Sequence, residues 1–163
     1  MDRTKRERNR RGDDILKYTE AKEVELIAKN LISKNEYLKK QKADEAKIYY
    51  LFKMDDAPYK GKCSLATGKW KYLTSCDFII EINKIDWVEL DEKAREALVY
   101  HELCHITYKE KDGNLKWKVK DHDIEEFLMV AEIYKDWREE LTQLKDNLNG
   151  VKRDGNEITD KKI

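Results

Sequence analysis

Two histidines lie four residues apart in the segment His101-Glu102-Leu103-Cys104-His105. Successive residues of an α-helix turn by about 100°, so residues four apart lie within about 40° of each other, one turn along. The segment therefore brings both imidazoles to one face only if it is helical. The preceding sequence supports a helix, because apolar residues repeat at helical spacing from Asp91, a suitable N-cap, to about Ile106.

These residue types at this spacing can hold a metal ion. His101 and His105 would present two imidazoles to one Zn²⁺, as in other helices of the HExxH pattern. Glu102 lies at the flank of that face, where its carboxylate can reach a water on the ion without replacing an imidazole. Zinc lowers the pKa of such a water from about 15.7 to about 7 and polarises a carbonyl. The pattern therefore predicts a zinc site with Glu102 as the general base.

A catalytic zinc site needs a third protein ligand and one open position. His122 is the preferred third ligand, since it completes the three histidines of the chain and is predicted to begin the last helix. Glu126 shares its helical face and Glu125 the adjoining one, so either carboxylate is an alternative ligand. A carboxylate that does not bind the metal would accept the free N–H of a ligand histidine. Cys104 is expected to be a small buried hydrophobe.

Two tyrosines flank the motif. Tyr100 precedes His101 directly, and Tyr108 follows the helix. Either phenol could donate a hydrogen bond to a developing oxyanion. Packing is the expected role of both.

The remaining patterns predict an α+β fold. A helix is expected from Thr19, as its cap, to Asn35, and the compact apolar runs 48–52 and 78–82 are typical of strands. Residues 62–74 are interpreted as extended, and the final helix is expected from about Asp121. The order predicts an N-terminal helix, a small mixed sheet, the HExxH helix and a C-terminal helix.

Length and composition limit the possible classes of protein. A chain of 163 residues is the size of one domain, and its 34 basic and 34 acidic side chains cancel, so no overall field directs it to nucleic acid or a membrane. No apolar run reaches the roughly 18 residues of a membrane span, and three cysteines do not make a disulfide framework. A cytoplasmic location is expected. We divide the chain into a basic, disordered arm (1–14), one domain (15–148) and a polar tail (149–163).

The stretch from Lys47 to Trp137 resembles the putative phage metallopeptidase family. The matching elements are YYLFK at 49–53, GKC at 61–63, DFIIEIN at 77–83, EKAREALVYHELCH at 92–105 and DHDIEEF at 121–127. The arrangement is also similar to SprT-like metalloproteases, in which a histidine beginning the next helix follows the HExxH helix. The chain lacks the C-terminal zinc ribbon of many SprT-like proteins, which argues against their DNA-linked role.

This resemblance implies a zincin-like fold, with His101, His105 and His122 as zinc ligands and Glu102 as general base. The resulting hypothesis is a zinc metallopeptidase, encoded by a phage or prophage and located in the host cytoplasm. Its substrate would be a peptide or protein lying along an edge strand near residues 77–83. Neither the physiological substrate nor the oligomeric state follows from the sequence.

Three alternatives stay open. The zinc could be structural, with Cys104 or Glu126 in the fourth position, and the protein a non-catalytic binding module. The protein could instead act at DNA through its basic arm. A zinc hydrolase of non-peptide amides would carry the same sequence pattern as a peptidase.

Overall fold

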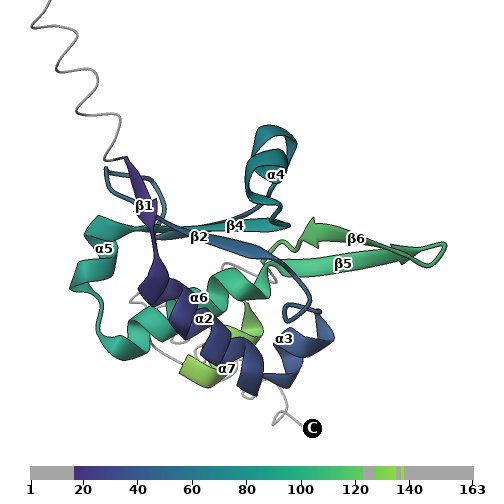
Figure 1. Cartoon of the computed structure of the whole chain (residues 1–163). Coiled ribbons are helices and arrows are strands. Elements are labelled where there is room, and N and C mark those ends of the chain that lie inside the picture. Colours follow the sequence, from purple (N-terminus) through teal and green to yellow (C-terminus); the bar gives the residue numbers. More distant parts are fainter. Residues whose placement is uncertain (1–16, 123–126, 135–136, 138–163) are drawn as a thin grey trace, which may run out of the picture.

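The structure, a computed structural model, describes residues 17–122, 127–134 and 137. The predicted arm (1–14), the tail (149–163) and the alternative ligands Glu125 and Glu126 lie outside these residues. Within them, the chain forms helices packed on a four-stranded sheet, and a separate two-stranded hairpin (Figure 1). The predicted α+β class is confirmed.

The main sheet is mixed. It consists of β1 (Tyr18–Glu20), β2 (Ile48–Lys53), β3 (Gly61–Leu65) and β4 (Phe78–Asn83), in the spatial order β1-β2-β4-β3. The central pair β2 and β4 is parallel, and the outer strands β1 and β3 run antiparallel to their neighbours. The strands predicted at 48–52 and 78–82 are therefore correct.

The prediction of an edge strand near residues 77–83 is wrong. β4 pairs with β2 on one side and with β3 on the other, so the edge next to β4 is β3. Buried residues on both faces of β4 explain this position, because Phe78 and Ile80 face one core cluster while Ile79 belongs to a second one. A strand that is apolar on both faces is typical of the interior of a sheet.

Helices cover both faces of this sheet unequally. They are α2 (Lys22–Lys34), α3 (Glu36–Lys40), α4 (Gly68–Thr74), α5 (Lys84–Glu89), α6 (Glu92–Cys104) and α7 (Leu128–Tyr134). Figure 1 shows α2, α6 and α7 on one side of the sheet and α4 on the other, and α6 contacts α2, α7 and β3. The larger core cluster lies between the sheet and α2 and α6. None of the helices in the described part of the chain has the length and apolar character needed to cross a membrane.

The first helix begins later than the sequence predicts. Thr19 is not its cap but lies in β1, where it pairs with Phe52, and α2 follows Ala21. Its predicted end is correct, since Asn35 is the C-cap of α2. The Asn35 side chain also accepts a hydrogen bond from the Leu38 N–H and so begins α3.

The expectation of extended structure over residues 62–74 is correct only for β3. Residues 68–74 form α4, which starts at Gly68 with a φ of +52°. No residue of α4 is buried, and Trp70 and Leu73 are exposed. The helix therefore lacks the apolar period by which a sequence reveals a helix.

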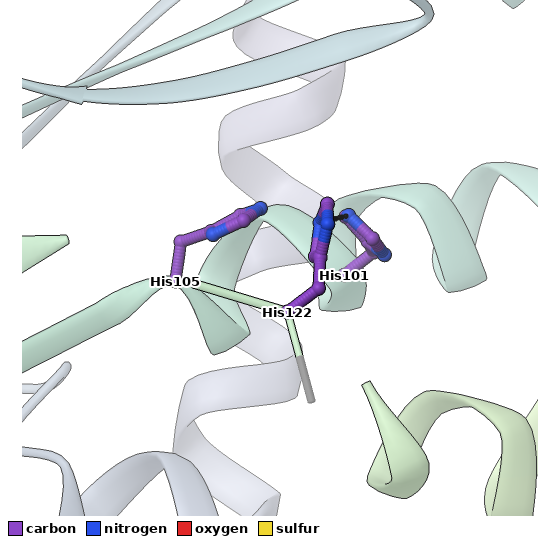
Figure 2. Close-up of side chains that lie close together, drawn as sticks. All are labelled: His101, His105 and His122. Carbon is purple, nitrogen blue, oxygen red and sulfur yellow. Dashed lines mark hydrogen bonds between the residues drawn. The ribbon is translucent and has the colours of Figure 1, made fainter. Parts of the chain in front are cut away.

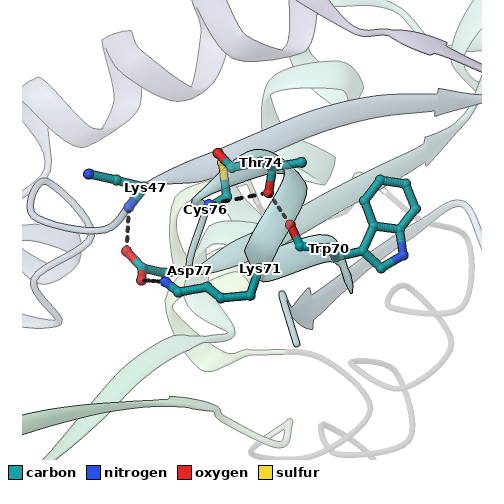
Figure 3. Close-up of polar contacts among 6 residues, drawn as sticks. All are labelled: Lys47, Trp70, Lys71, Thr74, Cys76 and Asp77. Carbon is teal, nitrogen blue, oxygen red and sulfur yellow. Dashed lines mark hydrogen bonds and ion pairs between the residues drawn. The ribbon is translucent and has the colours of Figure 1, made fainter. Parts of the chain in front are cut away.

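Asp77 joins the end of α4 to the start of the central strands (Figure 3). Its carboxylate accepts a hydrogen bond from the Lys47 N–H at 2.9 Å and from the Lys71 ammonium at 2.6 Å. The Thr74 hydroxyl donates to the Trp70 carbonyl at 2.7 Å and closes α4. These contacts hold the beginnings of β2 and β4 side by side, in the register that pairs residue 48 with residue 78.

Candidate metal centre

The HExxH helix forms as the sequence predicts. The Asp91 carboxylate accepts a hydrogen bond from the Ala94 N–H at 2.8 Å, and α6 runs from Glu92 to Cys104 with His105 as its C-cap. Every residue from Ala97 to Cys104 is buried, because the second half of the helix packs between the sheet and the neighbouring helices. This burial places His101, 6% exposed, and Glu102, 2% exposed, inside the molecule.

The structure brings all three histidines together (Figure 2). One ring nitrogen of each of His101, His105 and His122 lies within 4.8 Å of the other two. The closest pair is Nε2 of His101 and Nε2 of His122, at 2.9 Å. His101 is buried, His105 is partly buried and His122 is exposed, so the cluster opens to the surface on the His122 side. Such a group could hold a metal ion.

A hairpin that the sequence analysis missed carries His122 to this point. The strands β5 (Ile106–Lys111) and β6 (Asn114–Val119) leave the end of α6 and return to it. Asp112 and Gly113 turn between them with φ of 53° and 74°, as a type I′ turn requires. The Asp-Gly pair between alternating apolar residues was the sequence signal for this turn and for the two strands.

The final helix consequently starts later than predicted. Asp121 and His122 are not helical, and α7 begins at Leu128. The direction of the chain at His122 is set by β6, whose end is paired with the start of β5. His122 thus reaches the cluster from an irregular segment and not from the first turn of a helix.

Hydrogen bonds at the base of the hairpin determine the orientation of the His105 ring. The Lys120 N–H donates to the His105 carbonyl at 2.7 Å, and the Lys120 carbonyl lies 2.6 Å from His105 Nδ1. A carbonyl oxygen only accepts, so Nδ1 carries a hydrogen, and in the neutral imidazole Nε2 then presents its lone pair. The group that orients this imidazole is a backbone carbonyl, whereas the sequence analysis considered carboxylates for that role.

The Glu102 carboxylate lies between the cluster and the edge strand. Its Oε2 is 3.9 Å from Nε2 of His105. On the other side it faces Gly61 of β3, where an added Cβ would lie 2.5 Å from Oε1. Burial, and secondarily the Glu102 charge, raises the pKa of the Cys63 thiol well above its ordinary value. Cys63 is therefore a protonated packing residue beside the carboxylate.

Phe127 is a residue of this site that the sequence indicates only as part of the predicted final helix. It is 1% exposed, and its ring centroid lies 5.2 Å from that of His101, 4.7 Å from that of His105 and 5.2 Å from that of His122. The aromatic ring thus packs against all three imidazoles at once. It gives the cluster an apolar wall, which restricts the rotation of the rings.

The two tyrosines beside the motif pack as expected. Tyr100 is fully buried, its hydroxyl accepts a hydrogen bond from the Asn35 amide at 3.1 Å, and its ring packs against Tyr134. Tyr108 packs edge-on against Trp117 within the hairpin. Cys104 is buried as predicted.

Comparison with known proteins identifies the family. Residues 16–149 match the family described as Putative phage metallopeptidase. No curated protein and no solved structure matches the chain. The match covers most of the 163 residues and includes the whole histidine cluster. The chain therefore belongs to the putative phage metallopeptidase family.

Proposed function

We propose that this protein is a zinc-dependent peptidase in which Glu102 is the general base. The observation that carries the proposal is the convergence of three imidazoles beside a buried carboxylate, with ring nitrogens within 4.8 Å of one another. Membership of a metallopeptidase family supports the same conclusion. A peptide or protein would be the substrate.

The donor set suits a zinc ion. His101, His105 and His122 would hold it through neutral imidazole nitrogens, a set that leaves a fourth position for water or substrate. Ligand atoms around tetrahedral zinc lie about 3.4 Å apart for Zn–N bonds of 2.0–2.1 Å. The 2.9 Å between His101 and His122 and the 4.8 Å limit of the cluster lie on either side of that separation. When bound, zinc supplies an acidified water and polarises the scissile carbonyl.

Glu102 would move the proton. One carboxylate oxygen accepts a proton from water as the water oxygen forms its bond to the peptide carbon. The same carboxylic acid then donates that proton to the peptide nitrogen as the C–N bond breaks, and this leaves an amine and a carboxylate. Burial of Glu102 supports the role, since a carboxylate shielded from bulk solvent and packed against Gly61 keeps one position.

The edge strand β3 is the place we propose for the peptide. An extended peptide can add to an exposed sheet edge through backbone hydrogen bonds. β3 lies at the edge of the sheet, contacts α6 and begins at Gly61, next to the Glu102 carboxylate. A peptide paired with β3 would therefore pass beside the proposed base.

Glu102→Gln tests the chemistry, with Glu92→Gln, an exposed position on the same helix, as the control. Each protein is stripped of metal, reloaded with zinc, and assayed for bound zinc and for casein hydrolysis. We expect one zinc per chain in all three proteins. Hydrolysis should fall at least 100-fold for Glu102→Gln, the usual effect of removing a general base, and be unchanged for Glu92→Gln.

Two results would contradict the proposal in different ways. A wild-type protein that holds no zinc after reloading would refute the metal site. Zinc retained together with equal hydrolysis by wild type and Glu102→Gln would refute the catalytic role, and would favour a binding module stabilised by zinc.

A further inference from the structure

The β5–β6 hairpin has one face made of lysines. Residues that pair directly in an antiparallel ladder project to the same face. Lys109 pairs with Lys116, Lys111 with Asn114, and Thr107 with Lys118. We call the surface formed by Lys109, Lys111, Lys116 and Lys118 the lysine face. Three of these side chains are exposed, and Lys118 is partly exposed.

The opposite face of the hairpin is turned toward the domain. Tyr108 pairs with Trp117 there, and the Trp117 ring packs edge-on against Phe78 of the sheet, with centroids 5.5 Å apart. Ile106 on this face is fully buried. Glu110 pairs with Leu115 and therefore also projects away from the lysine face. Figure 1 shows the hairpin extending beyond the helices and the main sheet, so the lysine face is accessible.

Within the described part of the chain, no carboxylate pairs with the lysine face. Among the residues that the structure describes, none of these four lysines forms an ion pair with a carboxylate, whereas Lys29, Lys53 and Lys71 all do. Contact with the Lys109 side chain and the charge of Lys109 lower the pKa of Lys118, with smaller contributions from desolvation and from the charge of Lys116. Like charges directly opposite each other destabilise an antiparallel pair.

Protection of the strand edges does not account for this arrangement. Lysines on an edge strand oppose pairing with another chain, and this effect does not require two of them to face each other across the ladder. Lys109 faces Lys116, and Lys118 lies beside them. The hairpin therefore carries a repulsion that protection of its edges would not require. A polyanionic ligand would turn the repulsion into attraction. The whole chain has a net charge of zero and so gives no overall field that attracts a polyanion, which makes the attraction local to the hairpin.

We propose that the lysine face binds the phosphate backbone of double-stranded nucleic acid. A two-stranded β-ribbon is narrow enough for the major groove, about 12 Å wide. Its lysines are spaced by about 6.8 Å along each strand, the distance between alternate residues. They act as point charges toward phosphates and do not distinguish bases, so binding would be independent of sequence.

The position of the aromatic residues favours a duplex over a single strand. Proteins that bind single strands stack bases on exposed aromatic rings. Tyr108 and Trp117 lie on the face turned toward the domain, and the lysine face has no aromatic residue. Backbone contact is therefore the interaction that this surface offers. The proposal does not depend on peptidase activity.

The test measures the affinity of the full chain for a short DNA duplex of random sequence, by fluorescence anisotropy, at salt concentrations from about 50 to 200 mM. The four lysines of the lysine face are replaced together by Gln. The slope of log K against log salt concentration should decrease by up to about 3.6, since each phosphate contact contributes about 0.9. The control replaces four exposed lysines elsewhere, Lys22, Lys34, Lys40 and Lys93, with the same change in charge.

Two further variants separate binding from folding. Lys109→Gln with Lys116→Gln removes only the facing pair and should give about half of the decrease in slope. Replacement of all four lysines by Arg keeps the charge and should keep the affinity within a few-fold. The basic residues 1–14 are present in every protein compared, so their contribution to the slope cancels.

Several results would overturn the proposal. These are no binding by the wild type, an equal decrease in slope for the lysine-face and control variants, and tighter binding to a single strand than to a duplex of equal length. Binding of polyglutamate as tightly as the duplex would also overturn it, because the face would then accept acidic polymers in general. The expected result is a decrease in slope for the two Gln variants of the lysine face and not for the control, with binding kept by the Arg variant.

Discussion

Gly61 is the residue on which the position of the Glu102 carboxylate most directly depends. A Cβ added at Gly61 would lie 2.5 Å from Oε1 and 2.9 Å from Cδ of Glu102. The backbone of Gly61 is not in the left-handed region, which among the described glycines holds Gly68 and Gly113. Glycine is needed here for space and not for conformation. Any larger residue must displace either β3 or the carboxylate.

Gly61→Ala should therefore lower peptidase activity at least tenfold while the protein still binds zinc. It should also lower the free energy of unfolding in the presence of Glu102. In a Glu102→Ala background the same substitution should raise that free energy by about 0.4–1 kcal/mol, since the clash is gone and alanine restricts the unfolded chain. Urea unfolding of the four proteins measures this change of sign. Equal effects in both backgrounds would show that the two residues do not interact.

The sequence predicts which residues form the site better than it predicts which residues contact them in space. Asp91 as cap, the burial of Cys104 and the approach of His122 follow from local spacing and from residue chemistry. The contact of Gly61 with Glu102 depends on how β3 pairs with β4, a relation between distant segments that no local pattern encodes. Phe127 falls within the predicted final helix, and helical periodicity does not reveal which partners a side chain meets.

At the scale of elements, the hairpin connects two parts of the cluster. β5 begins directly after His105, β6 ends directly before Lys120, and the hydrogen bonds between His105 and Lys120 close the base. The geometry of the turn at Gly113 therefore affects the orientation of an imidazole at the other end of the hairpin. The conformation of the exposed turn at the tip of the hairpin is in this way linked to the orientation of the partly buried His105 ring.

Gly113→Val should weaken zinc binding about tenfold, the lower end of the effect of disturbing a group that orients a metal ligand. Gly113 has a φ of +74°, a conformation that a β-branched residue avoids, so the turn and the register of the hairpin would shift. Gly68→Val is the matched control, because Gly68 has a φ of +52° and its Cβ would also meet open space. Competition with a chelator measures the affinities. The link is disproved if both variants bind zinc alike.

The helices and strands that could be predicted from the sequence are those with clear apolar patterns. β2 and β4 are short apolar runs inside the sheet, and the sequence locates both. β5 and β6 contain no compact apolar run, and only the alternation of lysines with the residues that pack indicates them, whereas α4 has no buried face at all. Thr19 suits a helix cap by residue type, but pairing with β2 decides its conformation. Tertiary contacts override local preference at each of these places.

At the scale of the molecule, the cluster combines residues from two separate segments of the chain. His101 and His105 belong to the helix under the sheet, and His122 belongs to the chain between β6 and α7. A metal ion bound by all three would cross-link these segments in the folded state only. Binding to the folded state alone stabilises it by mass action.

Zinc should therefore raise the thermal unfolding temperature. At a concentration of 100 times Kd the stabilisation is about 2.7 kcal/mol, which corresponds to several degrees for a domain of this size. His122→Ala should lose most of this increase while its metal-free unfolding temperature stays within about 2 °C of wild type, because His122 is exposed. Scanning fluorimetry with and without zinc measures both. An equal zinc-dependent increase in the variant would exclude His122 as a ligand.

The α+β class was predictable because the order of apolar patterns along the chain sets it. The identity of the edge strand was not, since the order β1-β2-β4-β3 places a later strand between two earlier ones. Only the packing of both faces of β4 reveals that it is interior.

The carbonyl of Lys120 that orients His105 belongs to the main chain, so no point substitution can delete it. Its position depends on how many residues separate it from His105. Adding residues to the tip of the hairpin in pairs would keep its base in register, whereas adding one residue would invert the faces of a strand. A change in the length of the hairpin by even steps would therefore alter what its tip touches without altering the histidines. The geometry of the histidine cluster therefore depends on whether residues are added to the hairpin in even or odd numbers, as well as on the identity of the histidines.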